Sequence, residues 1–340
     1  MKAIIYYGPK DLRFEEAETP KIKDDEVMVN IKATGICGSD LAGYYGKRRN
    51  APMIMGHEFS GIITNIGKSV KQFKIGDRVT VDPIIFCGKC ELCKDRITNL
   101  CLNKNHLGVL DTNGSMAEYI AVAERLTYKL PDDISYEVAA MIEPLTVAIN
   151  AVNRAPEIEN KNVLIVGAGP IGLLILQVVK TKRPLNIFIS DINTTRLGFA
   201  KKIGADVTID VDKEDLLKII NEKTDFSGID IAFEAVGFSS TVQQAMSALK
   251  RRGTCVWVGN LEKMITIDMQ EIVLNELNVH GSYGHIYGDF SEAIKMLSNK
   301  ENKLDLESMI TKRVALRDAA KIFKELEKGT GDIIKIILTN

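Results

Sequence analysis

The segment VLIVGAGPIGLLILQVVKTKRPLNIFISD, residues Val163 to Asp191, decides the fold of this chain. It begins with the apolar run Val163–Val166 and continues through a glycine-rich turn into a long apolar segment that ends near Lys180. A second apolar run, Ile187–Ser190, is followed directly by Asp191. This order predicts a strand, a glycine turn, a helix and a second strand that ends on an acid.

The turn Gly167-Ala168-Gly169-Pro170-Ile171-Gly172 has the spacing of a dinucleotide-binding loop. Gly167 suits the tight turn, Gly169 lets a pyrophosphate approach the backbone, and Gly172 lets the helix pack on the strand. Pro170 occupies the first helical position, where a proline loses no hydrogen bond. The start of the helix then offers free N–H groups and the positive end of its dipole to the phosphates.

The acid at the end of the second strand predicts the choice of cofactor. Asp191 lies 19 residues beyond Gly172, where a carboxylate would bond the ribose hydroxyls of NAD and repel a 2′-phosphate. Arg196 is a reason for caution, because it could in principle reach the phosphate of NADP. The alternatives are an ordinary glycine turn or a membrane span, since Val163–Val179 has no charge. The glycine interruption leaves pieces shorter than the ~20 residues that a span needs.

The composition is that of an ordinary globular protein. The 340 residues are 45% hydrophobic and 26% charged, with a formal net charge of −1. This length allows two domains with separate cores, and the charge gives no reason to expect nucleic acid or a membrane as partner. The apolar run after Met1 is too short for a signal peptide, which predicts a cytoplasmic protein. Clustered cysteines in that compartment are typical of metal sites.

Two patterns divide the chain. Residues 1–148 alternate short strand-like runs, such as Glu26–Lys32, with glycine and charged turns, which predicts a mostly β domain. Residues 149–283 alternate strands with amphipathic segments, which predicts a doubly wound parallel sheet and an α/β fold. Residues 284–340 hold two expected helices and the terminal strand Ile333–Leu338. The six strands expected in the sheet are Val163–Val166, Ile187–Ser190, Val207–Ile209, Ile229–Ala235, Cys255–Val258 and Val279–Gly281.

A cysteine, a histidine and a glutamate form the first candidate metal site. Cys37 opens Cys-Gly-Ser-Asp, His57 is followed by Glu58, and Glu143 precedes Pro144. Thiolate, imidazole and carboxylate are the ligands of zinc, and a catalytic zinc takes three of them and leaves one position open. The alternative is three unrelated residues, because separation along the chain does not give distance in space.

Four further cysteines, Cys87, Cys90, Cys93 and Cys101, form the second candidate site. Their close spacing predicts a closed, tetrahedral structural zinc site. A zinc ribbon would instead need two C-x-x-C pairs about 15–20 residues apart. That spacing is absent, which disfavours a nucleic-acid ribbon, and free surface thiols are the remaining alternative. The sixth cysteine, Cys255, is expected in the core.

Together these motifs resemble the zinc-containing medium-chain dehydrogenases, and within them the sorbitol (polyol) and threonine dehydrogenase branch. The order of both cysteine motifs, Gly-His-Glu, Glu-Pro, the glycine turn and Asp191 carries the resemblance over essentially the whole chain. It implies a GroES-like catalytic domain (residues 1–148), a Rossmann domain (149–283) and a C-terminal segment (284–340) that returns to the catalytic side. It also implies NAD or NADP and a homodimer or homotetramer.

The resemblance implies roles for the catalytic residues. Zinc would be held by Cys37, His57 and either Glu58 or Glu143, the other carboxylate acting through water or from outside the ligand shell. Bound zinc polarises the substrate oxygen so that hydride can leave to nicotinamide. Ser39 matches the hydroxyl that takes the alcohol proton into a relay. Many relatives place a histidine three residues later, where this chain has Ala42.

Two other segments bear on the substrate. The basic run Lys47-Arg48-Arg49 lies where the family places a loop at the pocket mouth, and we interpret it as a solvated loop, with a clamp for a substrate phosphate as the alternative. Tyr283-Gly284-His285 lies where some polyol dehydrogenases carry an arginine and a tyrosine, and the Tyr-Gly pair is closer to threonine dehydrogenases. We interpret His106 and His280 as structural.

The sequence therefore predicts a zinc-dependent, NAD-linked dehydrogenase of a secondary alcohol, a polyol or sugar alcohol that is phosphorylated or not. A threonine-type 3-hydroxy amino acid dehydrogenase is the rival enzyme. A zinc protein that binds nucleotide as a sensor without turnover is the rival of another class. The sequence does not identify the alcohol, the ligating glutamate, the route by which the proton leaves, or the number of subunits.

Overall fold

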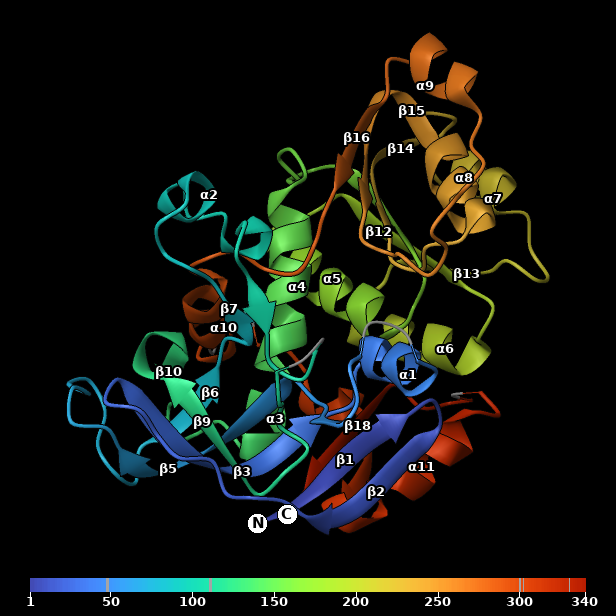
Figure 1. Ribbon diagram of the computed structural model, residues 1–340. Coiled ribbons are helices and arrows are strands. Elements are labelled where there is room, and N and C mark those ends of the chain that lie inside the picture. Colours follow the sequence, from blue (N-terminus) through green and yellow to red (C-terminus); the bar gives the residue numbers. More distant parts are fainter. Residues whose placement is uncertain (47–48, 110–111, 300, 302, 330) are drawn as a thin grey trace. The chain divides into compact units, whose positions relative to one another are not determined.

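The computed structural model describes the chain except for residues 47–48, 110–111, 300, 302 and 330. The chain forms two compact units: residues 1–143 with 286–340, and residues 144–285 (Figure 1). The chain passes from the first unit to the second within helix α4 (Ile142–Asn153). Among the helices described, none combines the length and the apolar character that a membrane span requires.

The second unit is built on one parallel sheet with the strand order β13-β12-β11-β14-β15-β16. Its strands are β11 (Asn162–Val166), β12 (Asn186–Asp191), β13 (Val207–Asp210), β14 (Ile229–Glu234), β15 (Leu249–Trp257) and β16 (Asn278–Gly281). Its further helices are α5 (Pro170–Lys180), α6 (Thr194–Ile203), α7 (Leu216–Lys223), α8 (Ser239–Ser247) and α9 (Met269–Leu274). The predicted doubly wound sheet is confirmed. Its strand order reverses between β11 and β14, the point at which such sheets bind ligands.

Burial explains why β11 has no polar–apolar alternation. All of its residues are buried, and helix α5 beside it is buried from Gly172 to Val179. A strand covered by helices on both faces becomes apolar throughout.

The first unit consists mainly of strands. They are β1 (Lys2–Gly8), β2 (Asp11–Glu16), β3 (Glu26–Gly35), β4 (Met53–Ile54), β5 (Glu58–Ile66), β6 (Arg78–Val81), β7 (Ile84–Ile85), β8 (Asn105–His106), β9 (Tyr119–Ala123), β10 (Thr127–Lys129), β17 (Ile310–Ala315) and β18 (Lys335–Thr339). Its helices are α1 (Gly38–Tyr44), α2 (Glu91–Lys94), α3 (Tyr136–Ala140), α10 (Asp289–Leu297) and α11 (Ala319–Leu326). Short 3₁₀ turns are η1 (Thr98–Leu100), η2 (Glu124–Leu126), η3 (Glu307–Met309) and η4 (Leu316–Asp318).

The last strand of the chain joins the main sheet of this unit, which has the order β10-β6-β5-β3-β18-β17, with β9 also paired to β3. Strand β18 runs antiparallel to β3, with Ile337 opposite Gly35, and parallel to β17. Residues at the two ends of the sequence therefore share one sheet, and β3 leads directly into the first candidate metal site.

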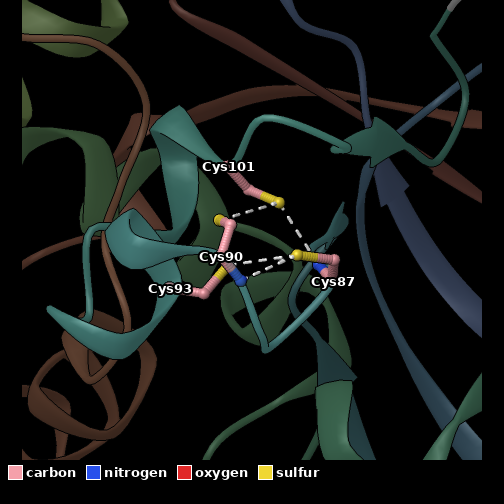
Figure 2. Close-up of side chains that lie close together, drawn as sticks. All are labelled: Cys87, Cys90, Cys93 and Cys101. Carbon is pink, nitrogen blue, oxygen red and sulfur yellow. Dashed lines mark hydrogen bonds between the residues drawn. The ribbon is translucent and has the colours of Figure 1, made fainter.

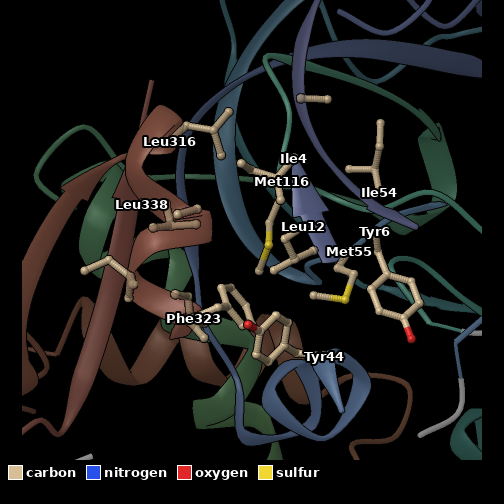
Figure 3. Close-up of a cluster of buried hydrophobic side chains, with 14 of the residues drawn as sticks. Ile4, Tyr6, Leu12, Tyr44, Ile54, Met55, Met116, Leu316, Phe323 and Leu338 are labelled. Carbon is tan, nitrogen blue, oxygen red and sulfur yellow. The ribbon is translucent and has the colours of Figure 1, made fainter. Parts of the chain in front are cut away.

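A hydrophobic core fixes helix α1 against the C-terminal helix α11 (Figure 3). The rings of Tyr44 on α1 and Phe323 on α11 have centroids 5.4 Å apart. The hydroxyl of Tyr44 donates a hydrogen bond of 2.8 Å to Glu327. Helix α1 carries Ser39, so this core holds in place the segment that follows Cys37.

Candidate functional site

Three side chains of the first candidate metal site lie together where β3 ends and β5 begins. Cys37 precedes α1 as its N-terminal cap, while His57 and Glu58 stand at the start of β5. Gly35 and Glu58 are paired residues of the β3–β5 ladder, so the sheet register brings these two segments side by side. One donor atom from each of Cys37, His57 and Glu58 lies within 4.8 Å of the others. The donor set fits a zinc ion.

Ser39 and Glu143 differ in their relation to this group. The hydroxyl of Ser39 lies 3.4 Å from Nε2 of His57. Glu143 is 6% exposed at the start of α4, and it does not belong to the set of donors that meet within 4.8 Å among the described residues. The structure thus places Glu58, and not Glu143, in the same set as Cys37 and His57.

The buried carboxylate of Asp40 orients two members of the group. It accepts a hydrogen bond of 3.1 Å from the backbone N–H of Cys37, and its Oδ1 lies 3.6 Å from Nδ1 of His57. Burial raises the pKa of Asp40, but the charges and hydrogen bonds of His57, Arg49 and Cys37 outweigh it and lower this pKa to about 2. Asp40 is therefore a carboxylate that presents its charge to the imidazole ring, an arrangement that orients metal-binding histidines.

A second buried ion pair includes Glu58, a member of the group. The ammonium of Lys335 on β18 pairs with Glu58 and donates a hydrogen bond of 3.1 Å to the carbonyl of Ile36. Burial lowers the pKa of Lys335, but the charges of Glu58, Cys37 and Glu143 raise it above its ordinary value. A Cβ atom on Gly35 would lie 2.1 Å from Oε2 of Glu58, so glycine is required beside this pair.

Sequence analysis missed Asp40 and Lys335. Asp40 stood in the cysteine motif without a role, and a lone lysine in the apolar run of β18 was a signal for a buried charge. His106, which we interpreted as structural, packs its ring edge to face against that of His57, with centroids 5.2 Å apart. Its Nδ1 is 2.9 Å from the carbonyl of Leu107.

The four remaining metal-site cysteines converge on one point, as Figure 2 shows. The Sγ atoms of Cys87 and Cys93 are 3.9 Å apart, as are those of Cys90 and Cys101. A tetrahedral zinc with bonds of about 2.3 Å requires sulfur atoms about 3.8 Å apart, so the spacing fits. The backbone amides of Lys89 and Cys90 lower the pKa of the Cys87 thiol to about 6, which favours a thiolate. Cys255 is buried.

The glycine turn of the second unit has the geometry expected of each residue. Gly167 has φ +99°, and a Cβ there would lie 2.5 Å from Val236. A Cβ on Gly172 would lie 1.8 Å from the carbonyl oxygen of Gly167, whereas none of the described atoms lies within 4 Å of a Cβ on Gly169. Space for a phosphate is thus left at Gly169. Pro170 and Ile171 form the first turn of α5.

Asp191 lies at the end of β12 beside this turn. Its carboxylate accepts hydrogen bonds from the backbone N–H groups of Ala168, at 2.6 Å, and Asn193, at 2.8 Å. A carboxylate has about four acceptor positions, so it can still accept from ribose hydroxyls. Arg196 lies in the first turn of α6, where its backbone N–H donates to Asn193.

Two segments were expected to bear on the substrate: the basic run Lys47-Arg48-Arg49 and the segment Tyr283-Gly284-His285. Lys47 and Arg48 lie outside the described residues. Our interpretation of Arg49 as solvated is wrong, because its side chain is 2% exposed and pairs with Asp40. In the Tyr283–His285 segment, the carbonyl of Gly284 accepts a hydrogen bond of 2.9 Å from Asn150.

Comparison with known proteins agrees with this geometry. Residues 23–132 match the family model described as the alcohol dehydrogenase GroES-like domain. Residues 170–299 match the model described as zinc-binding dehydrogenase.

Three relatives cover nearly the full length. D-arabitol-phosphate dehydrogenase of Enterococcus avium is 36% identical over 97% of this chain and 95% of its own. Sorbitol dehydrogenase of Bacillus subtilis is 31% identical over 99% of this chain and 97% of its own. The crystal structure of galactitol-1-phosphate dehydrogenase from Escherichia coli is 29% identical, covers 100% of both chains and has a TM-score of 0.93.

Proposed function

Because this chain belongs to the family of zinc-binding dehydrogenases with a GroES-like domain, we propose that Cys37, His57 and Glu58 hold its catalytic zinc. The protein is an oxidoreductase of alcohols that uses zinc and a nicotinamide dinucleotide. The observation that carries the assignment is the meeting of three donor atoms within 4.8 Å. Zinc held there would polarise the substrate oxygen and favour hydride transfer from the adjoining carbon to nicotinamide.

We propose that Glu58 is the third protein ligand and that Glu143 acts from outside the ligand set. Glu58 shares the group with the thiol and the imidazole, while Glu143 contributes charge that reaches Lys335. The charge of Asp40 faces Nδ1 of His57, which leaves Nε2 as the nitrogen that would bind the metal.

The proton of the alcohol requires a first acceptor, and we propose Ser39 for that role. Its hydroxyl is 3.4 Å from Nε2 of His57, so a substrate oxygen bound beside that nitrogen is within reach of Ser39. Ala42 offers no group that could pass the proton on. Exit through water, through the ribose of the nucleotide or through Glu58 is therefore expected.

We propose that the four-cysteine site holds a second, structural zinc, and that the glycine turn binds NAD in preference to NADP. The sulfur spacing supports the first assignment. The second is supported by Asp191, whose negative charge would repel a 2′-phosphate. The binding residues proposed are Gly167, Gly169, Pro170, Ile171, Gly172 and Asp191, with Arg196 beside them.

For the substrate we propose a polyol or a polyol phosphate. The names of three relatives support this choice: two are dehydrogenases of polyol phosphates and one acts on sorbitol. Turnover of arabitol, sorbitol, their phosphates and threonine, followed by NADH absorbance, tests the proposal. Polyols or polyol phosphates should be oxidised fastest. Faster turnover of threonine would favour the rival enzyme, and no turnover of any alcohol would favour the sensor.

We further propose that the chain forms a homodimer or a homotetramer in the cytoplasm. Strand β16 is an edge strand of its sheet, and the adjoining segment exposes Met264 (82%), Met269 (71%) and Leu274 (75%). Exposed large apolar side chains and an edge strand are both typical of interfaces. The six unpaired cysteines are consistent with a reducing compartment.

A further inference from the structure

Arg49 lies on the loop after α1, outside every motif that identified the metal site. Its guanidinium NH2 group contacts the first turn of α1 twice, at 3.3 Å from the carbonyl of Ser39 and at 3.3 Å from Oδ1 of Asp40. The side chains of Arg49 and Asp40 are 2% and 0% exposed. This pair is therefore part of the interior, and screening by solvent does not weaken it as it weakens surface pairs.

Helix α1 is shaped to receive this side chain. A Cβ atom on Gly43 would lie 2.9 Å from both Cγ and Nε of Arg49 and 3.1 Å from Cζ. The stem of the arginine thus runs over the helix at Gly43, where the absence of a Cβ leaves room for it. Two observations, the buried ion pair and the glycine that accommodates it, agree on one fixed position for the guanidinium.

The position of Asp40 makes this contact important for the metal site. Asp40 accepts from the backbone of Cys37 and faces Nδ1 of His57, so one carboxylate orients two of the three zinc donors. A buried carboxylate needs a compensating cation to keep that position. Lys335 is paired with Glu58, which leaves Arg49 as the permanent cation that the structure pairs with Asp40.

We propose that Arg49 is a positioning residue of the zinc centre, which acts by holding Asp40 and through it His57 and Cys37. The inference rests on the proposed function only in taking the group to be a zinc site. It assigns the third residue of the basic run to the metal centre and removes it from the candidates for a phosphate clamp.

The test measures metal binding separately from turnover. In Arg49→Met the zinc affinity of this site, measured by competition with a chelator, should fall about 10- to 100-fold, as is usual for residues that orient metal ligands. With cobalt in place of zinc, Arg49→Met should show a visible absorption spectrum that is shifted relative to that of the parent protein. Arg49→Lys keeps the positive charge but loses the planar guanidinium group, so its zinc affinity should lie between those of Arg49→Met and the parent protein. The four-cysteine site should keep its zinc in both variants.

A second variant approaches the contact from the helix. Gly43→Ala should displace Arg49, because the new Cβ would lie 2.9 Å from its Cγ and Nε, although alanine favours a helix more than glycine does. This variant too should weaken zinc binding. Arg13→Met, which removes an exposed pair with Asp11, is the matched control and should bind zinc as the parent does. A purely structural role would lower thermal stability in Arg49→Met and leave zinc affinity and cobalt spectrum unchanged, and that result would overturn the proposal. Parent protein that binds zinc without oxidising any alcohol would instead contradict the proposed function alone.

Discussion

Lys335 on the last strand and Glu58 at the start of β5 form an ion pair whose side chains are 2% and 1% exposed. The two residues are far apart in sequence, and the pairing of β18 with β3 brings them together. This pair gives the C-terminal strand a role at the metal site in addition to its place in the sheet. It also places a cation beside the carboxylate that we propose as a zinc ligand.

Removing the ammonium group of Lys335 should lower the free energy of unfolding. In the zinc-free protein, Lys335→Met leaves Glu58 buried without a cationic partner, and breaking a buried pair in this way destabilises a protein by about 3–5 kcal/mol. Urea unfolding measures the loss. The control is Lys312→Met, because Lys312 and Glu325 form a pair that is 37% and 47% exposed and should contribute less than about 1 kcal/mol. Equal losses of unfolding free energy in the two variants would show that the buried pair stabilises the protein no more than the exposed pair does.

Gly35→Ala should disturb the same pair from the backbone side. The new Cβ would lie 2.1 Å from Oε2 of Glu58 and 3.0 Å from Cε of Lys335, so the carboxylate must move. We expect loss of zinc from the catalytic site, measured by metal analysis. Gly198→Ala is the control: its Cβ meets none of the described atoms within 4 Å, and the variant should keep its zinc. Full zinc content in Gly35→Ala would show that Glu58 does not need its present position.

Asp191 should set the preference for NAD. Because its carboxylate also accepts from Ala168 and Asn193, alanine would loosen the glycine turn as well as remove the charge. Asp191→Asn keeps one acceptor oxygen and is the sharper variant. The ratio of kcat/KM for NAD to that for NADP should fall about tenfold or more. Comparable kcat/KM for both cofactors in the parent protein would show that the carboxylate does not discriminate between them.

Substitution of the two arginines of the basic run should affect the kinetics of phosphorylated and unphosphorylated substrates differently. Arg49→Ala should lower turnover of a polyol and of its phosphate by the same factor, because the side chain of Arg49 is buried against Asp40. If Arg48 binds a phosphate, Arg48→Ala should raise KM for the phosphorylated form alone. Steady-state kinetics on a matched pair, such as arabitol and arabitol phosphate, separates these cases. A phosphate-selective effect of Arg49→Ala would contradict the assignment of Arg49 to the metal site.

Local sequence patterns predicted the fold, the glycine turn and the four-cysteine site. The glycine turn was predictable because its residues are neighbours in sequence, and the backbone angle of Gly167 and the contact at Gly172 follow from the turn itself. The four-cysteine site was predictable for the same reason. The choice between Glu58 and Glu143 was not, because it depends on the register of β3 against β5.

The residues that sequence analysis missed depend on contacts between distant segments. Lys335 reaches Glu58 only through the pairing of β18 with β3, and Arg49 reaches Asp40 only because Gly43 leaves room above the helix. A charged residue in an apolar strand indicates a buried ion pair, and a glycine within a helix indicates a close contact. Neither identifies the residue on the other side of the contact.

The zinc content and activity of two cysteine variants test the central claim most directly. The parent protein should hold about two zinc ions per chain, one in the open site and one in the closed site. Cys101→Ser should lose the structural ion and thermal stability, with any loss of activity following the loss of folded protein. Cys37→Ser should stay folded, bind NADH, hold about one zinc ion and lose most of its turnover. Full activity in Cys37→Ser, or oxidation of alcohols by the metal-free protein, would contradict the claim that zinc at Cys37, His57 and Glu58 carries the reaction.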